Sequence, residues 1–250
     1  MEKWPRETAE TVSDELRASN RELNDFVLLV SHDLKAIRRG MSLLDSSTSE
    51  DRPDVSDDEI RAQTLLLAER VNRLDDLVTL MARYIKIGES HESDTAVALD
   101  KVVEDVSTET AVPSHVSILT EGLLPVVRCR RTAVTEVFSC LLKSALRQID
   151  QVQGVIRIRC EEEGQFWKLT VSDSGPGIVP QGGQDLFRLF HATPNSHWED
   201  FGTTLAMAKR SVEACGGRIW VEAGAGGGTH VHFTLPKVPR GEPALTKKWE

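Results

Sequence analysis

The fold of this chain is decided by the stretch Phe26-Val27-Leu28-Leu29-Val30-Ser31-His32-Asp33-Leu34-Lys35. The apolar residues in and around it alternate in steps of four and three, which predicts the buried seam of a left-handed helical bundle. This seam consists of Leu23, Val27, Val30, Leu34, Ile37, Met41 and Leu44. If Val27 and Val30 are the a and d positions of a heptad, His32 falls at f, which points furthest from the seam. We therefore expect an imidazole on the solvent face of a helix, with the Asp33 carboxylate next to it.

An exposed imidazole is a nucleophile near neutral pH, and a neighbouring carboxylate can hold its tautomer and accept its proton. A lone histidine on a helix face is more often a solvated polar residue with no further role. The function of His32 therefore depends on what the rest of the chain contains.

A second helix is expected after a polar segment that ends at Pro53. Ser56-Asp57-Asp58-Glu59 has the form of a capping box with acidic residues in the first turn. The four-and-three spacing then returns at Ile60, Thr64, Leu67, Val71, Leu74, Val78, Met81 and Ile85. Two such helices predict an antiparallel hairpin. Leu66, Leu77 and Tyr84 widen its apolar stripe beyond what one hairpin covers, so we expect dimerisation into a four-helix bundle.

From Val97 onward the pattern changes to a mixture of helices and strands. Helices are predicted at 99–106, 132–148 and 205–214, the last closed by Gly216-Gly217. Strands are predicted at 116–119, 126–128, 155–159, 168–171, 218–222 and 230–235, with a turn at Glu163-Gly164. These elements indicate an α+β domain that follows the helical hairpin in the sequence.

Composition narrows the classes of function. The 250 residues carry a formal net charge of −9, which argues against general affinity for nucleic acid or an anionic membrane. No run of eighteen apolar residues and no signal peptide is present in the sequence, so we expect a cytoplasmic protein. The four cysteines are widely spaced without nearby histidines, which favours buried thiols over a metal site.

Several motifs together resemble the core of sensor histidine kinases, particularly the phytochrome-like group. Ser31-His32-Asp33-Leu34-Lys35 resembles their phospho-acceptor box. Asp173-Ser174-Gly175-Pro176-Gly177-Ile178, followed by Leu186-Phe187-Arg188-Leu189-Phe190 and Gly227-Gly228-Thr229, resembles the GHKL-type ATPase domain shared with gyrase, chaperone and mismatch-repair ATPases. The resemblance covers roughly residues 20–237. It implies a helical dimerisation and phospho-acceptor domain at 1–90, a two-layer α+β ATPase domain at 95–237 and a disordered tail at 238–250.

The resemblance also implies a site and its ligands. ATP with magnesium would donate a phosphoryl group to His32, activated by Asp33, and the group would pass to an aspartate of a response regulator. The carboxylate of Asp173 would accept a hydrogen bond from the adenine amino group, with Gly175 and Gly177 allowing the backbone to approach the base. The remaining nucleotide-binding positions are Gly202, Thr203, Ser144 and Arg147.

The chain departs from the family pattern around the triphosphate. Ser144 stands where the family has a magnesium-binding asparagine, and its hydroxyl is a poor replacement. Thr204 and Ala206 replace glycines of the phosphate-binding loop. At a position of positive φ, Thr204 would cost about 1–3 kcal/mol, unless the loop adopts another shape. We therefore expect reduced or lost ATP and magnesium affinity. Ala36 also replaces a residue that orients water in phosphatase-competent relatives, so we expect little phosphatase activity.

Three hypotheses remain open. The chain is a working kinase of a two-component system, or a degenerate kinase (a pseudokinase) that serves a phosphorelay as a phosphotransferase or binds response regulators. The third is a regulator that forms heterodimers with an intact kinase instead of a homodimer. No sensor domain precedes the helical region in this sequence, so a separate sensor protein is a possible partner.

Overall fold

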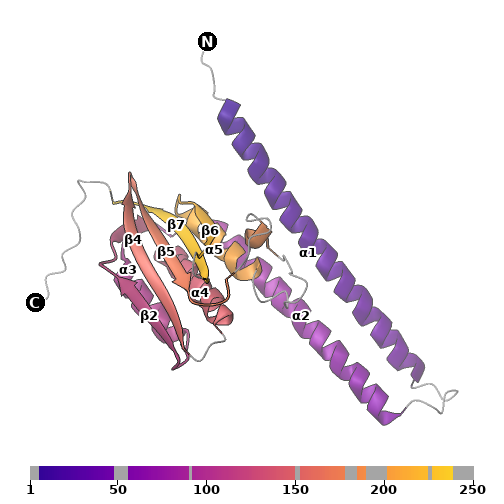
Figure 1. The fold of residues 1–250 in the computed structure, drawn as a ribbon. Helices are drawn as coiled ribbons and strands as arrows, with labels where there is room; N and C mark the ends of the chain where they lie inside the picture. The colour runs from indigo at the N-terminus through magenta and orange to yellow at the C-terminus, as the bar shows by residue number, and fades with distance from the viewer. Residues whose placement is uncertain are drawn as a thin grey trace, which may run out of the picture. The chain divides into compact units, whose positions relative to one another are not determined.

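The computed structural model describes residues 6–47, 56–89, 92–149, 153–177, 185–189, 202–224 and 227–238. The chain divides into two compact units, Met1–Arg83 and Tyr84–Glu250. Helices form the first unit, and a mixed sheet with helices forms the second (Figure 1). Apart from Val238, the tail predicted at 238–250 lies outside the described residues.

The first unit is a hairpin of two long helices, α1 (Arg6–Ser47) and α2 (Asp57–Glu89). The capping box is confirmed, because the Glu59 amide donates to Ser56 Oγ (3.3 Å) and the Ser56 amide donates to Glu59 Oε2 (3.2 Å). Gly40 lets the helices approach closely, since a Cβ there would lie 2.6 Å from Leu67 Cδ2. α1 continues three residues beyond the end predicted near Leu44.

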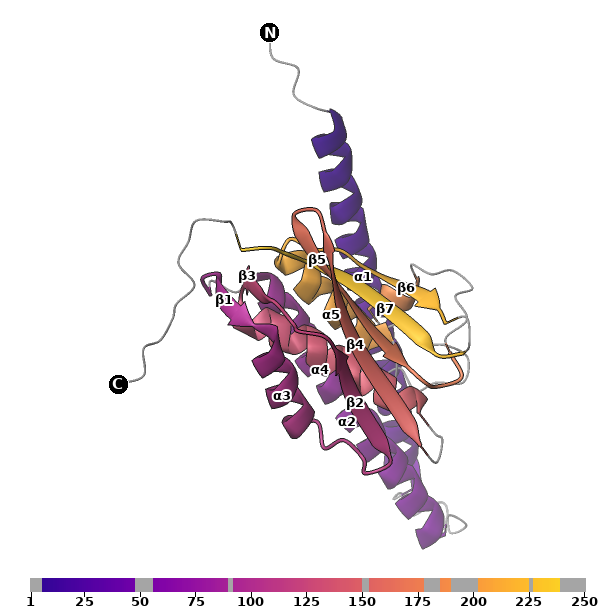
Figure 2. The ribbon, with the colours of Figure 1, turned by 60° about the vertical axis from the view of Figure 1, so that its left-hand side comes forward.

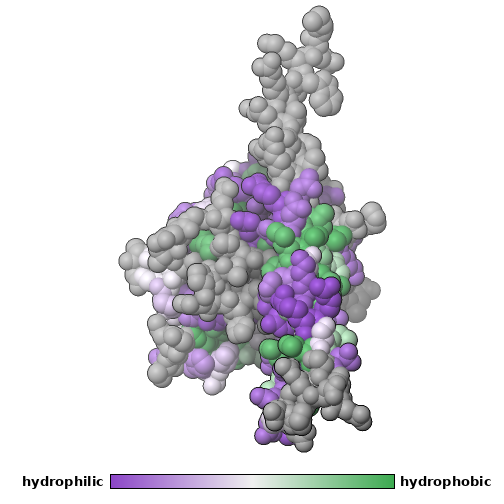
Figure 3. All heavy atoms as spheres, turned by 90° about the vertical axis from the view of Figure 1, so that its right-hand side faces the viewer, coloured by the Kyte–Doolittle hydropathy of each residue, from purple (hydrophilic) through white to green (hydrophobic). Residues whose placement is uncertain are grey.

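The hairpin leaves much of its predicted seam uncovered. Leu77 is fully buried, but several seam residues of both helices are roughly half exposed: Leu23, Val27, Leu34, Met41, Val71 and Val78. Figure 3 shows apolar surface next to hydrophilic surface on one face of the molecule. Several half-exposed apolar residues along one helical seam are typical of an interaction site.

The second unit contains a five-stranded sheet in the order β2-β4-β5-β7-β6. β2 pairs with β4 in parallel, and all other neighbours are antiparallel. The strands are β2 (Val116–Glu121), β4 (Gly154–Glu163), β5 (Phe166–Asp173), β6 (Ile219–Ala223) and β7 (Thr229–Pro236). The predicted strands are thus confirmed, each with slightly shifted or wider bounds. A separate antiparallel pair joins β3 (Val126–Cys129) to β1 (Thr95–Ala98). The sequence predicted β3 at 126–128 but did not predict β1.

Helices α3 (Leu99–Glu109), α4 (Arg131–Gln148) and α5 (Gly202–Ala214) lie on one face of the sheet (Figure 2). A short 3-10 helix, η1 (Asp185–Phe187), precedes α5. The core between the layers contains Phe138 of α4 and Phe233 of β7, whose rings meet edge to face at 5.7 Å. This layer arrangement confirms the α+β character of the domain.

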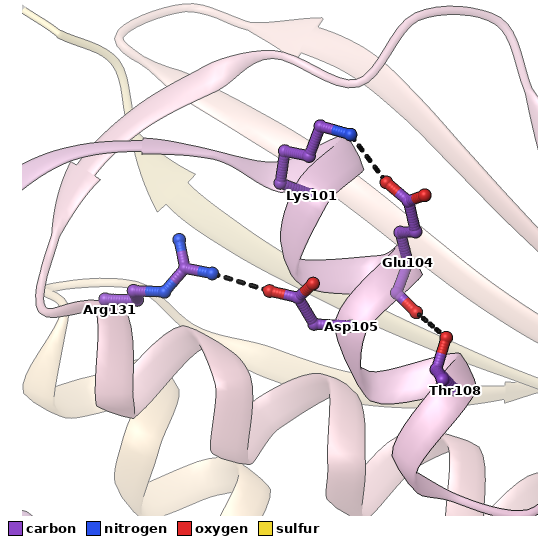
Figure 4. A network of polar contacts seen from close by, with 5 residues as sticks. All are labelled: Lys101, Glu104, Asp105, Thr108 and Arg131. Atoms are coloured by element: carbon purple, nitrogen blue, oxygen red, sulfur yellow. Dashed lines mark hydrogen bonds and ion pairs between the residues drawn. The ribbon is translucent and has the colours of Figure 1, made fainter.

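Polar contacts on the surface join α3 to the start of α4. Arg131 Nη2 pairs with Asp105 Oδ2 at 2.7 Å, while Lys101 pairs with Glu104 within α3 at 2.6 Å (Figure 4). The Thr108 hydroxyl donates to the Glu104 carbonyl (2.9 Å). Because these groups are solvent-exposed, each pair contributes little to stability.

The four cysteines are thiols, and Cys129, Cys140 and Cys215 are buried as predicted. Burial raises the pKa of the half-buried Cys160 thiol to about 11, with the neighbouring Glu161 adding to the shift.

Among the described residues, no helix combines the length and the apolar run that a bilayer crossing requires.

Candidate functional site

His32 lies on α1 with its side chain 70% exposed, as its f position predicts. Its Nδ1 is 3.1 Å from Asp33 Oδ1. An ionised carboxylate only accepts hydrogen bonds, so the contact requires the proton on Nδ1. If the ring is neutral, Nε2 then carries the lone pair.

Asp33 itself lies inside the hairpin and is only 1% exposed. Its Oδ2 is 3.2 Å from Arg73 Nε, and its Oδ1 is 3.9 Å from Arg70 Nη1, both on α2. The expected carboxylate next to the imidazole is therefore confirmed, but it is buried while the imidazole is exposed. The residue after f is rotated about 100° around the helix, so Asp33 turns toward α2 while His32 remains outside.

Asp173 ends β5 in the second unit, at the edge of the described loop 174–177. Its Oδ1 accepts hydrogen bonds from the amides of Gly175 (2.9 Å) and Thr229 (3.4 Å). Burial raises the pKa of this carboxyl, and the hydrogen bonds from Gly175 and Thr229 oppose the shift in part. A partly desolvated carboxylate fixed in this way can accept a hydrogen bond from an amino group of a planar base.

The backbone around Asp173 is packed too tightly for side chains. A Cβ on Gly228 would lie 2.0 Å from the Asp173 carbonyl oxygen, and one on Gly177 would lie 2.7 Å from the Gly228 carbonyl oxygen. A Cβ on Gly175 would lie 2.6 Å from the Gln148 carbonyl oxygen, at the end of α4. Gly177 and Gly228 also have positive φ, of 85° and 80°. Glycine at these positions therefore lets three backbone segments pack closely around Asp173.

The residues predicted to contact the triphosphate meet between α4 and α5. Arg147 Nη1, in the last turn of α4, donates to Thr204 Oγ1 in α5 at 3.4 Å. Gly202 begins α5 and Thr204 is helical, so the strain considered for a positive φ at Thr204 is absent. The side chain of Thr203 lies outside the described residues.

Ser144 is buried on α4, as is Cys140, whose thiol donates to Glu136 Oε1 at 3.3 Å. Magnesium takes an octahedral set of oxygen ligands. The Cys140 thiol offers no oxygen, and the buried Ser144 hydroxyl reaches less far than the asparagine side chain that the family pattern has there. Ser144 is therefore a poor replacement for that asparagine as a magnesium ligand.

Three contacts in these sites were not predicted from the sequence. The Thr229 amide donates to Asp173, and Arg70 and Arg73 lie beside Asp33. Thr229 belongs to the Gly227-Gly228-Thr229 motif, but its contact with Asp173 depends on β7 pairing with β5. Arg73 directly precedes the seam residue Leu74. This position next to the seam was the feature of the sequence that could have predicted its contact with α1.

The α/β unit matches a known protein family. Residues 129–239 match the family described as histidine kinase-, DNA gyrase B- and HSP90-like ATPase. The chain is 31% identical to cyanobacterial phytochrome B of Nostoc sp. over 230 residues, which are 90% of this chain and 31% of that protein. It is 30% identical to the methanogenesis regulatory histidine kinase FilI of Methanothrix harundinacea, over 89% of this chain and 25% of that protein. The chain thus spans about a third or less of these relatives' length.

The fold is also similar to that of solved histidine kinases. The structure of histidine kinase ThkA in complex with response regulator protein TrrA matches with a TM-score of 0.59 and 20% identity. The match covers 92% of this chain and 67% of that one. It therefore includes both the helical region and the α/β unit.

Proposed function

We propose that this chain, which is a sensor histidine kinase core with a GHKL-type ATPase domain, transfers a phosphoryl group to His32 and from there to an aspartate of a response regulator. The observation that carries the proposal is the exposed imidazole, with its Nδ1 3.1 Å from a buried carboxylate. A solvated polar residue would not need such a partner. A role as phosphoryl acceptor is therefore favoured over that of a solvated surface residue.

The acceptor residues divide the chemistry between them. His32 Nε2 attacks the phosphorus, and the Nδ1 proton stays on the ring, where it is held by Asp33 Oδ1. The imidazolium that forms lies against the Asp33 carboxylate, which stabilises its charge. In the second step Nε2 is the leaving group when a receiver carboxylate attacks the same phosphorus.

ATP supplies the γ-phosphoryl group when it is bound. The Asp173 carboxylate and the backbone of Gly175 and Gly177 would hold the adenine, and the Arg147 guanidinium would neutralise phosphate charge. The Ser144 hydroxyl reaches less far than an asparagine side chain toward magnesium, so we propose that ATP binds weakly.

The proposed partners are a receiver domain and a second copy of the chain. A receiver domain is supported by the similar kinase ThkA, which was solved in complex with a response regulator protein. The half-exposed seam of α1 and α2 supports a homodimeric four-helix bundle, because burying it would remove apolar surface from water. Heterodimers with another kinase and a separate sensor protein are further possibilities, which mixing experiments would separate.

The test is incubation of the full chain with ATP labelled at the γ-phosphate, with and without magnesium. We expect slow, acid-labile labelling that disappears in His32→Ala and falls at least about tenfold in Asp173→Asn. Labelling that persists in His32→Ala would overturn the assignment of the acceptor.

A second candidate function is favoured by Ser144. If the wild-type chain takes no label from ATP, and calorimetry shows no heat with ATP and magnesium, the chain is a phosphotransferase or regulator-binding module without kinase activity of its own. Its His32 would then take label from a phosphorylated receiver domain. Failure with both donors would exclude both functions.

A further inference from the structure

Asp33 is almost completely removed from water although it neighbours an exposed histidine. A buried carboxylate without compensation is strongly disfavoured. Compensation comes from α2, where Arg73 Nε is 3.2 Å from Oδ2 and Arg70 Nη1 is 3.9 Å from Oδ1. The closer arginine thus holds the oxygen that His32 does not use.

Two contacts on different oxygens orient the carboxylate. Oδ2 forms an ion pair with Arg73 that lacks hydrogen-bond geometry, and Oδ1 lies 3.1 Å from His32 Nδ1. Without Arg73, the carboxylate could rotate toward Arg70 and lose its alignment with the ring. The orientation of an exposed ring on α1 therefore depends on a residue of α2.

We propose that Arg73, assisted by Arg70, is a positioning residue for phosphoryl acceptance: through Asp33 it holds the Nδ1–H tautomer of His32 and leaves Nε2 as the nucleophile. The inference rests on the proposed function of His32. In this proposal Asp33 orients the His32 ring and does not act as a free base, because His32 contacts one of its oxygens and Arg73 contacts the other.

The step can be followed with phosphoramidate, a small donor that needs no nucleotide site. Nε2 of the neutral ring forms a bond to phosphorus, the phosphorus–nitrogen bond of phosphoramidate breaks, and ammonia leaves. The proton on Nδ1 remains, so the product ring is an imidazolium beside the Asp33 carboxylate. Arg73 thereby acts on a group that gains charge during the step.

The experiment compares full-length variants reacted with phosphoramidate. Arg73→Met removes the charge, Arg73→Lys retains it, and Arg61→Met is the matched control at an exposed position twelve residues earlier on α2. The exposed His115 of the second unit serves as an internal reference for unassisted reaction. ¹⁵N spectra of the imidazole rings in alkaline buffer report the His32 tautomer independently of any phosphorylation.

We expect Arg73→Met to slow phosphorylation of His32, relative to His115, on the order of tenfold to a hundredfold. It should also shift the ring toward the Nε2–H tautomer. Arg73→Lys should recover part of the rate, and Arg61→Met should change neither readout. In an Asp33→Asn background, Arg73→Met should change the rate less than about twofold, because the arginine acts through Asp33.

Equal slowing by Arg73→Met in the wild-type and Asp33→Asn backgrounds would overturn the inference, as would an unchanged tautomer in a folded Arg73→Met chain. If Arg73→Met does not fold, the same two readouts are measured in Arg73→Lys and Asp33→Asn. A wild-type tautomer and a wild-type phosphorylation rate in Asp33→Asn would then contradict the inference. If wild-type His32 takes no phosphoryl group from phosphoramidate or ATP, the proposed function fails, while the tautomer comparison still decides the role of Arg73.

Discussion

Replacing Gly228 by alanine tests whether the backbone around Asp173 forms a nucleotide site. A Cβ at this position would lie 2.0 Å from the Asp173 carbonyl oxygen. Gly164 is a matched control, because it also has positive φ but its Cβ would meet nothing within 4 Å. Both variants place alanine at a positive φ, but only Gly228→Ala brings a Cβ against the backbone of Asp173.

The shared cost comes from φ, which is 80° at Gly228 and 58° at Gly164. Alanine in this region costs about 1–2 kcal/mol, and reduced entropy of the unfolded chain offsets about 0.4–1 kcal/mol of that. Only Gly228→Ala adds overpacking against backbone that cannot rotate away, about 1–3 kcal/mol. At roughly 2–4 °C per kcal/mol for a domain of this size, its unfolding midpoint should fall about 2–12 °C further than that of Gly164→Ala.

The assay is calorimetric unfolding of the full chain, following the transition of the second unit, together with titration by ADP. Gly228→Ala should also bind ADP at least about tenfold more weakly, a loss of about 1.4 kcal/mol, whereas Gly164→Ala should bind as wild type does. Equal midpoints for the two variants, or wild-type ADP binding by Gly228→Ala, would refute the argument.

Three further predictions concern the Asp173 carboxyl, magnesium binding at Ser144 and the proposed dimer. Burial raises the folded-state pKa of Asp173, so its stabilising contribution is present below the unfolded pKa and is lost as pH rises through the folded value. Asp173→Asn should therefore keep or raise the unfolding midpoint at pH 7 while weakening ADP binding about ten- to a hundredfold, and a lower midpoint there would contradict this. Ser144→Asn should raise ATP affinity about tenfold by calorimetry only when magnesium is present; a gain without magnesium would point to another cause. Val71→Glu should convert the proposed dimer to monomer in light scattering, because the seam would bury a charge. Leu123→Glu, at a site 97% exposed, should leave the proposed dimer intact.

The helical hairpin was predictable because its signals are local. The heptad spacing around His32 and the capping box at Ser56 depend on residues within a few turns of one another, and both features are present in the structure. The environment of Asp33 was not predictable in the same way. It is set by arginines of α2, Arg70 and Arg73, and only the pairing of the helices brings them to Asp33.

The α/β unit shows the same division. Strands β4 and β5 were evident from their alternation and the turn at Gly164, whereas the four residues of β1 are strand only because β3 pairs with them. The family pattern suggested strain at Thr204. Its helical backbone in α5 shows that this strain is absent.

The most direct test of the account is to locate the phosphoryl group. The chain would be incubated with ATP and, separately, with phosphoramidate, then mapped by mass spectrometry under alkaline conditions that preserve phosphohistidine. The account predicts one phosphoryl group on His32 with at least one donor, and none there in His32→Ala. A wild-type chain that carries no phosphoryl group on His32 with either donor would contradict it.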